Sequence, residues 1–295
     1  MTTILALRPS PRSSRSPEPG IVITPLVERL LLDLWAVRQL TLAQIRQAHY
    51  AHVSERPGLW QSSLPSRACR HLVNAGFLAC RPVPIERRGG GRPPLVYFLA
   101  TGAAPVLSRL LDLPIADVLA RIKQDRQLSW LFWRHRAAAA DCYLALSRAC
   151  EHAGTLLTWT GDEQLAGMKL TAELEGKRRS VRPDAFFVLD GSTTVPRFVE
   201  VQLTSEPRAY RLKAQGYHRF YASGDYERRF GFRSLRVLAL TDTPTRAQHL
   251  REAVDHPSIA EPRLFWATTI AQFTADPFGD IWLVPQSAEP RTLLG

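Results

Sequence analysis

The sequence predicts an α+β protein with two domains, and three observations support this prediction. The chain has 295 residues, 45% of them apolar, which is enough to bury two separate cores. Residues 21–102 contain three helical patterns followed by a basic, glycine-rich hairpin. Residues 128–295 have the order helix, three strands, helix, strand, which indicates an αβββαβ domain with a mixed sheet.

The charge balance favours a polyanionic partner. Lys and Arg number 38 against 27 Asp and Glu, which gives a formal net charge of +11 and a pI near 10.1. Most of the cations are arginines, whose planar guanidinium groups bind phosphate in a bidentate manner and also bind guanine edges. We therefore expect a nucleic acid as the partner, and the winged helix predicted below specifies double-stranded DNA.

Membrane association and secretion are not expected. No apolar run approaches the ~20 residues that a membrane-spanning helix needs. Residues 1–20 form a basic arm rich in Arg, Ser and Pro, which predicts disorder and lacks the apolar core of a signal peptide. The four cysteines have neither CxxC spacing nor histidines at zinc-ligand intervals. The composition therefore predicts a cytoplasmic protein with reduced thiols.

The first domain begins with three predicted helices. Apolar residues recur at helical spacing in residues 24–37, 42–50 and 64–75. Thr24 and Thr41 are the expected N-caps of the first two helices. Ser62 or Ser63 is expected to cap the third helix, and Gly76 to end it.

The third helix is the predicted DNA-reading element. Its apolar face is expected to consist of Leu64, Ala68, Leu72 and Ala75. Its polar face carries Arg67, Arg70 and Asn74, side chains of the types that donate paired hydrogen bonds to guanine or bind adenine in the major groove. We therefore predict that these three residues contact bases.

A hairpin with a basic tip follows the third helix. Strands are predicted over residues 77–84 and 94–100, and the tip between them holds three consecutive glycines together with Arg87, Arg88 and Arg92. Three helices and such a hairpin are typical of a winged helix-turn-helix, in which the arginines of the wing contact phosphates. A protein–protein adaptor with a solvated hairpin loop fits the same pattern, so this alternative stays open.

A helical connector is predicted over residues 103–127, with Pro114 at the start of its second part. A long helix over residues 129–153 then opens the second domain. His135 lies on the apolar stripe of this helix. We interpret it as a hydrogen-bonded core residue in preference to a catalytic residue.

Two carboxylates mark the centre of the second domain. Strands are predicted over residues 181–189 and 197–204, and each carries one carboxylate among apolar neighbours, Asp184 in the first and Glu200 in the second. A buried carboxylate is costly unless it is paired or coordinates a cation. We therefore predict that Asp184 and Glu200 share a Mg²⁺ ion, a cation that prefers oxygen ligands.

Gln202 and Lys213 complete the predicted catalytic set. Side-chain alternation places Glu200 and Gln202 on the same face of their strand. The arrangement matches a PD-(D/E)xK nuclease core, the restriction-endonuclease-like fold, with glutamine in place of the usual lysine. On the next helix, Tyr210, Lys213 and Tyr217 lie at i, i+3 and i+7, so Lys213 is on the same face as the two tyrosines. Its side chain either reaches the sheet and supplies the missing cation or extends its ammonium group into solvent.

The other expected elements of the second domain complete the αβββαβ order. They are a strand over residues 155–160, an irregular insert over 161–177, a helix over 206–222, a strand over 235–241, a helix over 245–254, and short strands over 264–268 and 281–284. In this order the two carboxylates fall on the second and third strands. The sequence predicts no role for residues 255–295 beyond these strands and turns.

Three motifs together resemble the replication-relaxation family of plasmid and mobile-element proteins. They are Arg182-Pro183-Asp184, Phe198-Val199-Glu200-Val201 and Tyr210-x-x-Lys213-x-x-x-Tyr217, behind a winged helix. The likeness covers roughly residues 22–255. It implies DNA binding linked to replication, relaxation or mobilisation, on a fold similar to PD-(D/E)xK nucleases. That family often has an acidic residue where this chain has Gln202, whereas some restriction enzymes of the wider superfamily carry glutamine there and cut DNA.

The sequence leaves three functions in competition. The first is a DNA-binding protein of a plasmid or mobile element whose nuclease-like domain contributes backbone binding, with or without cutting. The second is an active Mg²⁺-dependent endonuclease. The third is a winged-helix transcription regulator or assembly adaptor whose second domain mainly mediates self-association. The expected protein partners are a second copy of the chain, as a homodimer, or other plasmid-maintenance proteins. The DNA sequence recognised and the oligomeric state are not predicted.

Overall fold

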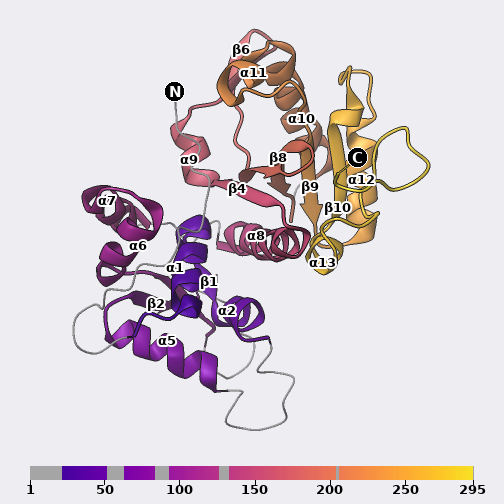
Figure 1. The fold of residues 1–295 in the computed structure, drawn as a ribbon. Coiled ribbons are helices and arrows are strands. Elements are labelled where there is room, and N and C mark those ends of the chain that lie inside the picture. The colour runs from indigo at the N-terminus through magenta and orange to yellow at the C-terminus, as the bar shows by residue number, and fades with distance from the viewer. Residues whose placement is uncertain (1–21, 52–62, 84–92, 126–132, 204–205, 295) are drawn as a thin grey trace. The chain divides into compact units, whose positions relative to one another are not determined.

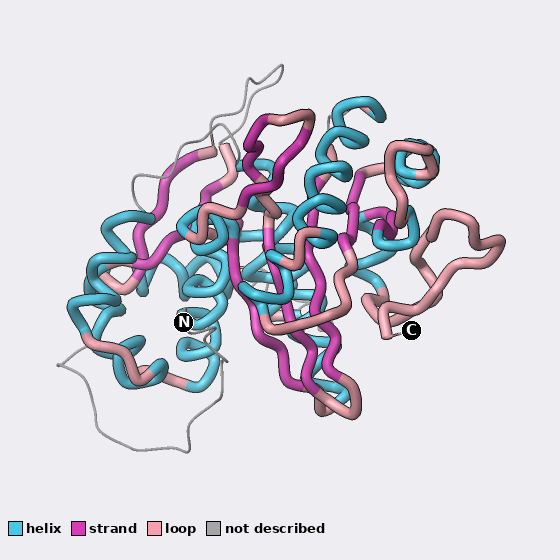
Figure 2. The backbone as a smooth tube through the Cα atoms, turned by 90° about the horizontal axis from the view of Figure 1, so that it is seen from above, coloured by secondary structure: helices cyan, strands magenta, loops and turns pink. Residues whose placement is uncertain are grey.

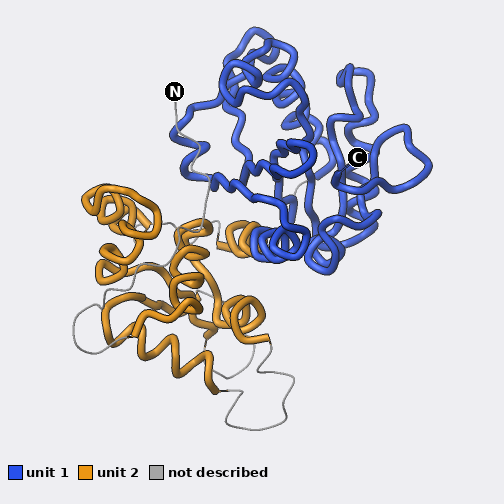
Figure 3. The backbone as a smooth tube through the Cα atoms, viewed as in Figure 1, with its two compact units in different colours: residues 1–6, 141–295 blue, residues 7–140 orange. Residues whose placement is uncertain are grey.

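The computed structural model describes residues 22–51, 63–83, 93–125, 133–203 and 206–294. These residues divide into two compact units, one ending at Ala140, called the first unit below and drawn in orange in Figure 3, and one beginning at Asp141, called the second unit and drawn in blue. The division falls within the long helix α8 (Trp133–Ala153). The predicted arm and the predicted wing contacts Arg87, Arg88 and Arg92 lie outside the described residues.

The first unit combines helices with a small antiparallel sheet (Figure 1). Its elements are α1 (Pro25–Val37), β1 (Leu40–Thr41), α2 (Leu42–His49), α5 (Leu64–Asn74), β2 (Leu78–Pro82), β3 (Leu95–Leu99), η1 (Thr101–Ala103), α6 (Ala104–Leu111) and α7 (Ile115–Asp125). Strand β3 lies between β1 and β2 and pairs antiparallel with both. The three predicted helices and the two hairpin strands are confirmed, and this arrangement is compatible with a winged helix.

Local sequence signals determine where these helices begin and end. The Thr24 hydroxyl accepts a backbone N–H from the first turn of α1. In α2 the Thr41 hydroxyl accepts from the Gln44 N–H (3.2 Å) and the Gln44 side chain accepts from the Thr41 N–H (2.8 Å), a reciprocal capping box. Ser63 occupies the N-cap position of α5 without a capping hydrogen bond. Gly76 follows α5 with a φ of +75°, which glycine adopts without strain.

The buried face of α5 differs from the prediction. Pro65, Cys69 and Leu72 are buried, whereas Leu64 is 37% exposed and Ala75 is also exposed. The predicted stripe began one residue too early, at Leu64, and was therefore rotated relative to the true one. The i, i+4, i+7 spacing of the three buried residues is the helical periodicity that the structure uses.

The predicted connector packs on the first unit as helices α6 and α7. Arg38 ends α1 in the left-handed conformation and forms a buried ion pair with Asp125 of α7. The Arg121 guanidinium of α7 lies 4.0 Å from the centre of the Trp35 ring of α1, in a cation–π contact. Polar and aromatic contacts thus join α7 to α1.

The second unit is built on a five-stranded mixed sheet (Figure 2). Its elements after α8 are β4 (Leu156–Gly161), α9 (Asp162–Gly167), β5 (Thr171–Leu174), β6 (Lys177–Ser180), β7 (Ala185–Asp190), β8 (Thr194–Val201), α10 (Pro207–Ala222), α11 (Asp225–Phe230), β9 (Val237–Thr241), α12 (Pro244–Val254), η3 (Pro262–Leu264), β10 (Phe265–Thr269) and α13 (Ile270–Ala275). The strand order is β10-β9-β8-β7-β4, with β4, β7 and β8 antiparallel and β8, β9 and β10 parallel. The predicted αβββαβ order is present as α8, β4, β7, β8, α10 and β9.

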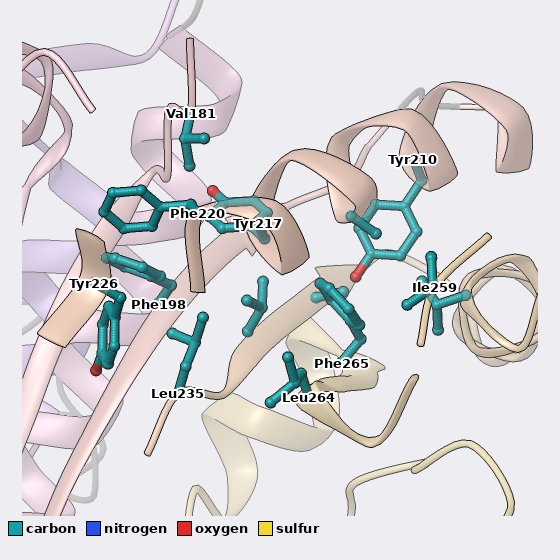
Figure 4. Packing of buried hydrophobic residues seen from close by; sticks show 14 of the residues in the cluster. Val181, Phe198, Tyr210, Tyr217, Phe220, Tyr226, Leu235, Ile259, Leu264 and Phe265 are labelled. Carbon is teal, nitrogen blue, oxygen red and sulfur yellow. The ribbon is translucent and has the colours of Figure 1, made fainter. Parts of the chain in front are cut away.

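Helices cover both faces of this sheet. On one face, Tyr143 of α8 contacts Trp159 of β4 edge-on, and Trp159 stacks on Phe187 of β7. On the other face, Tyr217 of α10 packs on Phe198 of β8, with ring centres 5.7 Å apart (Figure 4). Strand β8 is therefore buried between two layers of side chains, and seven of its eight residues are buried.

Several predictions about the second unit were wrong in detail. The insert over residues 161–177 is not irregular, because it contains α9 and the start of a β5–β6 hairpin. Strand β7 begins at Ala185 rather than at residue 181, because Pro183 has no N–H for a strand ladder. The strand predicted over residues 281–284 is reduced to isolated bridges. Helices α11 and α13 were not predicted, and each has only six residues.

The C-terminal segment packs against the sheet. Arg197 of β8 is buried and donates from Nη2 to the Leu293 carbonyl (3.2 Å), and its guanidinium lies 5.6 Å from the centre of the Trp266 ring. Trp282 is fully buried between Trp266 and Phe273. Part of the segment for which the sequence predicted no role therefore completes the core beside β8.

Candidate functional site

The candidate site is centred on Glu200, which is fully buried in β8. Its Oε1 accepts a hydrogen bond from the Tyr217 hydroxyl. Its Oε2 accepts from Gln202 Nε2 (3.0 Å) and from the ammonium group of Lys213. Three donors of this chain therefore compensate one buried carboxylate, which would otherwise be costly to remove from water. We call these four residues the Glu200 centre.

The periodicity of two elements assembles the Glu200 centre. Glu200 and Gln202 are two residues apart in extended chain, so their side chains lie on the same side of β8, as predicted. Lys213 and Tyr217 are four residues apart in α10, so they lie on the same face of that helix. That face packs on the sheet through Tyr217 and its neighbours (Figure 4). The Lys213 ammonium reaches Glu200, which is one of the two orientations that the sequence left open.

Gln202 is held firmly in its position after β8. Its backbone N–H donates to the Leu240 carbonyl (2.7 Å), and its own carbonyl accepts from the Thr241 hydroxyl (2.8 Å). These contacts to β9 fix the backbone, while the side-chain amide donates to Glu200. Gln202 therefore acts as a neutral donor in the Glu200 centre.

Asp184 lies beside this centre, immediately before β7. Its backbone N–H donates to the Val199 carbonyl (3.0 Å), and its Oδ2 accepts from the Val201 N–H (2.7 Å). Burial first, and then repulsion by the Glu200 carboxylate, raise the pKa of Asp184 to about 7. The two predicted acids are therefore close enough to interact electrostatically.

The charges of Lys213 and the two acids are coupled. Burial lowers the pKa of Lys213, but the negative charges of Glu200 and Asp184 outweigh this effect, so its pKa lies above the ordinary value. Burial, and then the charge of Glu200, raise the pKa of Tyr217 well above its usual range, so Tyr217 keeps its hydroxyl proton. At neutral pH the centre consequently contains one ammonium group and one hydroxyl donor directed at Glu200.

A divalent cation does not fit these residues in their present arrangement. Both oxygens of Glu200 already accept hydrogen bonds, and one of them contacts an ammonium group that would repel Mg²⁺. Within the described parts of the chain, no group of three or more His, Cys, Asp or Glu residues is placed to hold a metal. Mg²⁺ at Asp184 and Glu200 therefore stays a prediction, and it requires Lys213 to leave Glu200.

The predicted base-contacting residues share the exposed face of α5. Arg67, Arg70 and Asn74 are all exposed, at i, i+3 and i+7 of the helix, and the buried Cys69 and Leu72 occupy the other side.

Sequence reasoning missed Tyr217 as a member of the candidate site. The tyrosines of α10 were interpreted as packing residues, and Tyr217 does pack on Phe198. A signal was present nevertheless, because Tyr217 follows Lys213 by one helical turn and both face the strand that carries a buried carboxylate. A buried tyrosine hydroxyl needs a hydrogen-bond partner, and Glu200 provides it.

The fold and the Glu200 centre define a two-unit α+β protein with a buried acidic centre on a mixed sheet. The family model for replication-relaxation matches residues 31–235, more than half of the chain, and the chain belongs to this family. Membership indicates a role in the replication or relaxation of a plasmid or mobile element. Comparisons with curated proteins and with solved structures gave no match. In the described residues, no helix combines the length and apolar character needed to cross a bilayer.

We predict that Lys213→Met destabilises the protein by about 1–3 kcal/mol, because it leaves the buried Glu200 carboxylate with neutral donors only. The lower part of the range applies if solvent screens the pair, since the Lys213 side chain is 39% exposed. The double variant Lys213→Met/Glu200→Gln should recover part of the loss, because it contains no buried charge at this position. Urea unfolding of the four members of this cycle measures the coupling.

The matched control is Arg228→Met, which removes a cation from the exposed ion pair with Asp225. We expect this change to alter the free energy of unfolding by about 0.5 kcal/mol or less. Equal effects of the two substitutions would contradict a compensating role for Lys213.

The raised pKa of Asp184 predicts a pH dependence of stability. The folded state holds the Asp184 proton more tightly than the unfolded state, so this residue lowers the free energy of unfolding as the pH rises from about 4 to about 7. Asp184→Asn keeps an acceptor for the Val201 N–H and removes the titration. The variant should gain stability relative to the wild type between pH 5 and pH 8. A difference that is independent of pH would refute this prediction.

Proposed function

We propose that this chain binds double-stranded DNA sequence-specifically and acts in the replication, relaxation or mobilisation of a plasmid or mobile element. In this proposal the first unit reads the DNA through α5, and the second unit binds the DNA backbone without cutting it. The observation that carries the proposal is the exposed row of Arg67, Arg70 and Asn74 on α5.

The chemistry of this row supports direct base reading. Arginine binds the O6 and N7 atoms of guanine in a bidentate manner, and asparagine binds the N6 and N7 atoms of adenine in the same way. Residues at i, i+3 and i+7 of one helix follow a single line along its surface, as base-contacting residues of a major-groove helix do. The net charge of +11 adds a sequence-independent attraction to DNA.

The composition of the Glu200 centre supports binding without cleavage. Lys213, which the sequence offered as the missing catalytic cation, instead donates to the Glu200 carboxylate that a nuclease would need as a ligand for a divalent cation. The ammonium group neutralises Glu200. It is not a Lewis acid, so it cannot coordinate a water molecule and lower the pKa of that water as a divalent cation does. In this proposal Glu200 has a structural role in the nuclease-like second unit and no catalytic one.

An Mg²⁺-dependent endonuclease is the second candidate. The proximity of Asp184 and Glu200 favours it. Burial, and then repulsion by the Glu200 carboxylate, raise the pKa of Asp184, and a divalent cation would relieve that repulsion. This candidate requires Lys213 to move away from Glu200 when metal and DNA bind.

We predict that Arg67→Ala and Arg70→Ala each relax sequence preference, at a cost of about 1–3 kcal/mol per lost base contact. The probe is a duplex selected from a random pool with the wild-type protein, compared with a scrambled duplex. Affinity for the selected duplex should fall while affinity for the scrambled one changes little. The control is Arg109→Ala on α6, where Glu28 neutralises the arginine (3.0 Å), and it should leave both affinities unchanged. Equal losses on both duplexes would reject α5 as the reading helix.

We predict that the wild-type protein leaves supercoiled plasmid intact in the presence of Mg²⁺ or Mn²⁺, because Lys213 occupies Glu200. Agarose gel electrophoresis detects nicked and linear products. The Asp184→Ala/Glu200→Ala variant is the matched control. Metal-dependent nicking by the wild type that is absent from the variant would reject the non-cutting form of the proposal and establish the endonuclease.

A further inference from the structure

We infer that residues 177–182 form a second DNA-binding surface, which contacts the phosphate backbone through the second unit. We call these residues the basic segment. The inference rests on the proposed function, since it assigns the backbone contacts of the second unit to particular side chains. Four of the six residues in the basic segment are cationic and none is acidic, namely Lys177, Arg178, Arg179 and Arg182.

The fold presents the basic segment on the surface. It consists of β6 and the two residues that follow, and all four cations are exposed. The partner strand β5 buries Ala172 and Leu174 and packs against α10, so β6 is the outer strand of this hairpin. A regular strand anchored in this way holds its cations at fixed intervals.

Among the residues that the structure describes, the cations of the basic segment have no carboxylate partners. Within the described residues no ion pair involves any of the four, although Glu173 lies opposite Arg178 across the hairpin and Glu175 occupies its turn. Three other arginines of the second unit, by contrast, are each paired with a carboxylate. Arg228 pairs with Asp225 (2.6 Å), Arg233 with Glu227 (3.0 Å) and Arg246 with Asp242 (2.6 Å). The basic segment therefore keeps a charge that a polyanion can neutralise.

Two hydroxyl groups orient two of the three arginines of the basic segment. Arg178 donates from Nε to the Thr171 hydroxyl (2.9 Å), and Arg182 donates from Nε to the Ser180 hydroxyl (3.1 Å). Each bond engages Nε and makes no use of the terminal nitrogens, which are the groups that bind phosphate oxygens in pairs. This orientation lowers the entropic cost of binding, because the side chains are already directed.

The position of the basic segment connects it to the Glu200 centre. Only Pro183 separates Arg182 from Asp184. A DNA strand bound along the basic segment would therefore run toward the buried acidic centre without needing that centre for affinity. Sequence would not affect this contact, because phosphates are the same at every base step.

Exposed charges on an outer strand also have a purely protective use, because they prevent edge-to-edge association of sheets. This alternative predicts aggregation after their removal, with no change in DNA binding. Removal of the cations should therefore weaken DNA binding under the first interpretation and cause aggregation under the second.

The experiment compares two triple variants of the full chain. The test variant is Arg178→Gln/Arg179→Gln/Arg182→Gln, and the control variant is Arg228→Gln/Arg233→Gln/Arg246→Gln, which removes the same number of cations from carboxylate-paired positions. Binding to a scrambled duplex and to the selected duplex is measured by fluorescence anisotropy at several salt concentrations. Thermal unfolding and light scattering establish that each variant is folded and monodisperse.

We expect the test variant to lower the slope of log affinity against log salt concentration by about 2–3, since each phosphate contact contributes about 0.9. The ratio of affinities for the selected and scrambled duplexes should stay the same, and the control variant should retain the wild-type slope. Equal slopes in the two triple variants would overturn the inference, as would aggregation of the test variant with unchanged DNA binding. If Arg67→Ala relaxes preference while the test variant binds like the wild type, the proposed function stands and this inference fails. Absence of DNA binding by the wild type would reject both.

Discussion

The compensation of one buried negative charge organises the second unit. Glu200 lies in β8, the central strand of the sheet, and has no contact with solvent. A carboxylate in that position is tolerated only because Tyr217, Gln202 and Lys213 donate to it. These donors come from the same sheet and from α10, so the contacts that neutralise Glu200 also fix α10 on the sheet. Stability and any function of this centre therefore depend on the same atoms.

Most of the candidate site could be predicted from the sequence because it follows simple periodicities. The alternation of β8 placed Glu200 and Gln202 on one side, and the structure joins them by a hydrogen bond. Helical spacing placed Lys213 toward the sheet, but it could not decide whether the ammonium reaches Glu200 or solvent. That outcome depends on how far α10 lies from β8, which is a tertiary distance. The partner of Tyr217 escaped prediction for the same reason.

The fold was predictable at the level of element order, and the errors occur where elements are short. The predicted insert contains β5 and the first residue of β6, two strands of four residues each, which form because they pair with each other and because β5 packs on α10. In α5 the predicted apolar face was shifted by one residue, because Leu64 is exposed at the first turn and Pro65 packs inward. The local sequence pattern does not determine which short segments pair as strands or which residues at a helix end are buried.

The hydrogen bond between Arg197 and Leu293 joins residues 96 positions apart, and this separation has a consequence for synthesis on the ribosome. The first unit can fold as soon as its own residues leave the exit tunnel, because domains generally fold as units during translation. The guanidinium of Arg197, by contrast, can form its hydrogen bond to the Leu293 carbonyl only after the 96 further residues up to Leu293 have been synthesised. We therefore expect a nascent chain to pass through a stage in which the first unit is folded and the second still lacks the residues that contact Arg197.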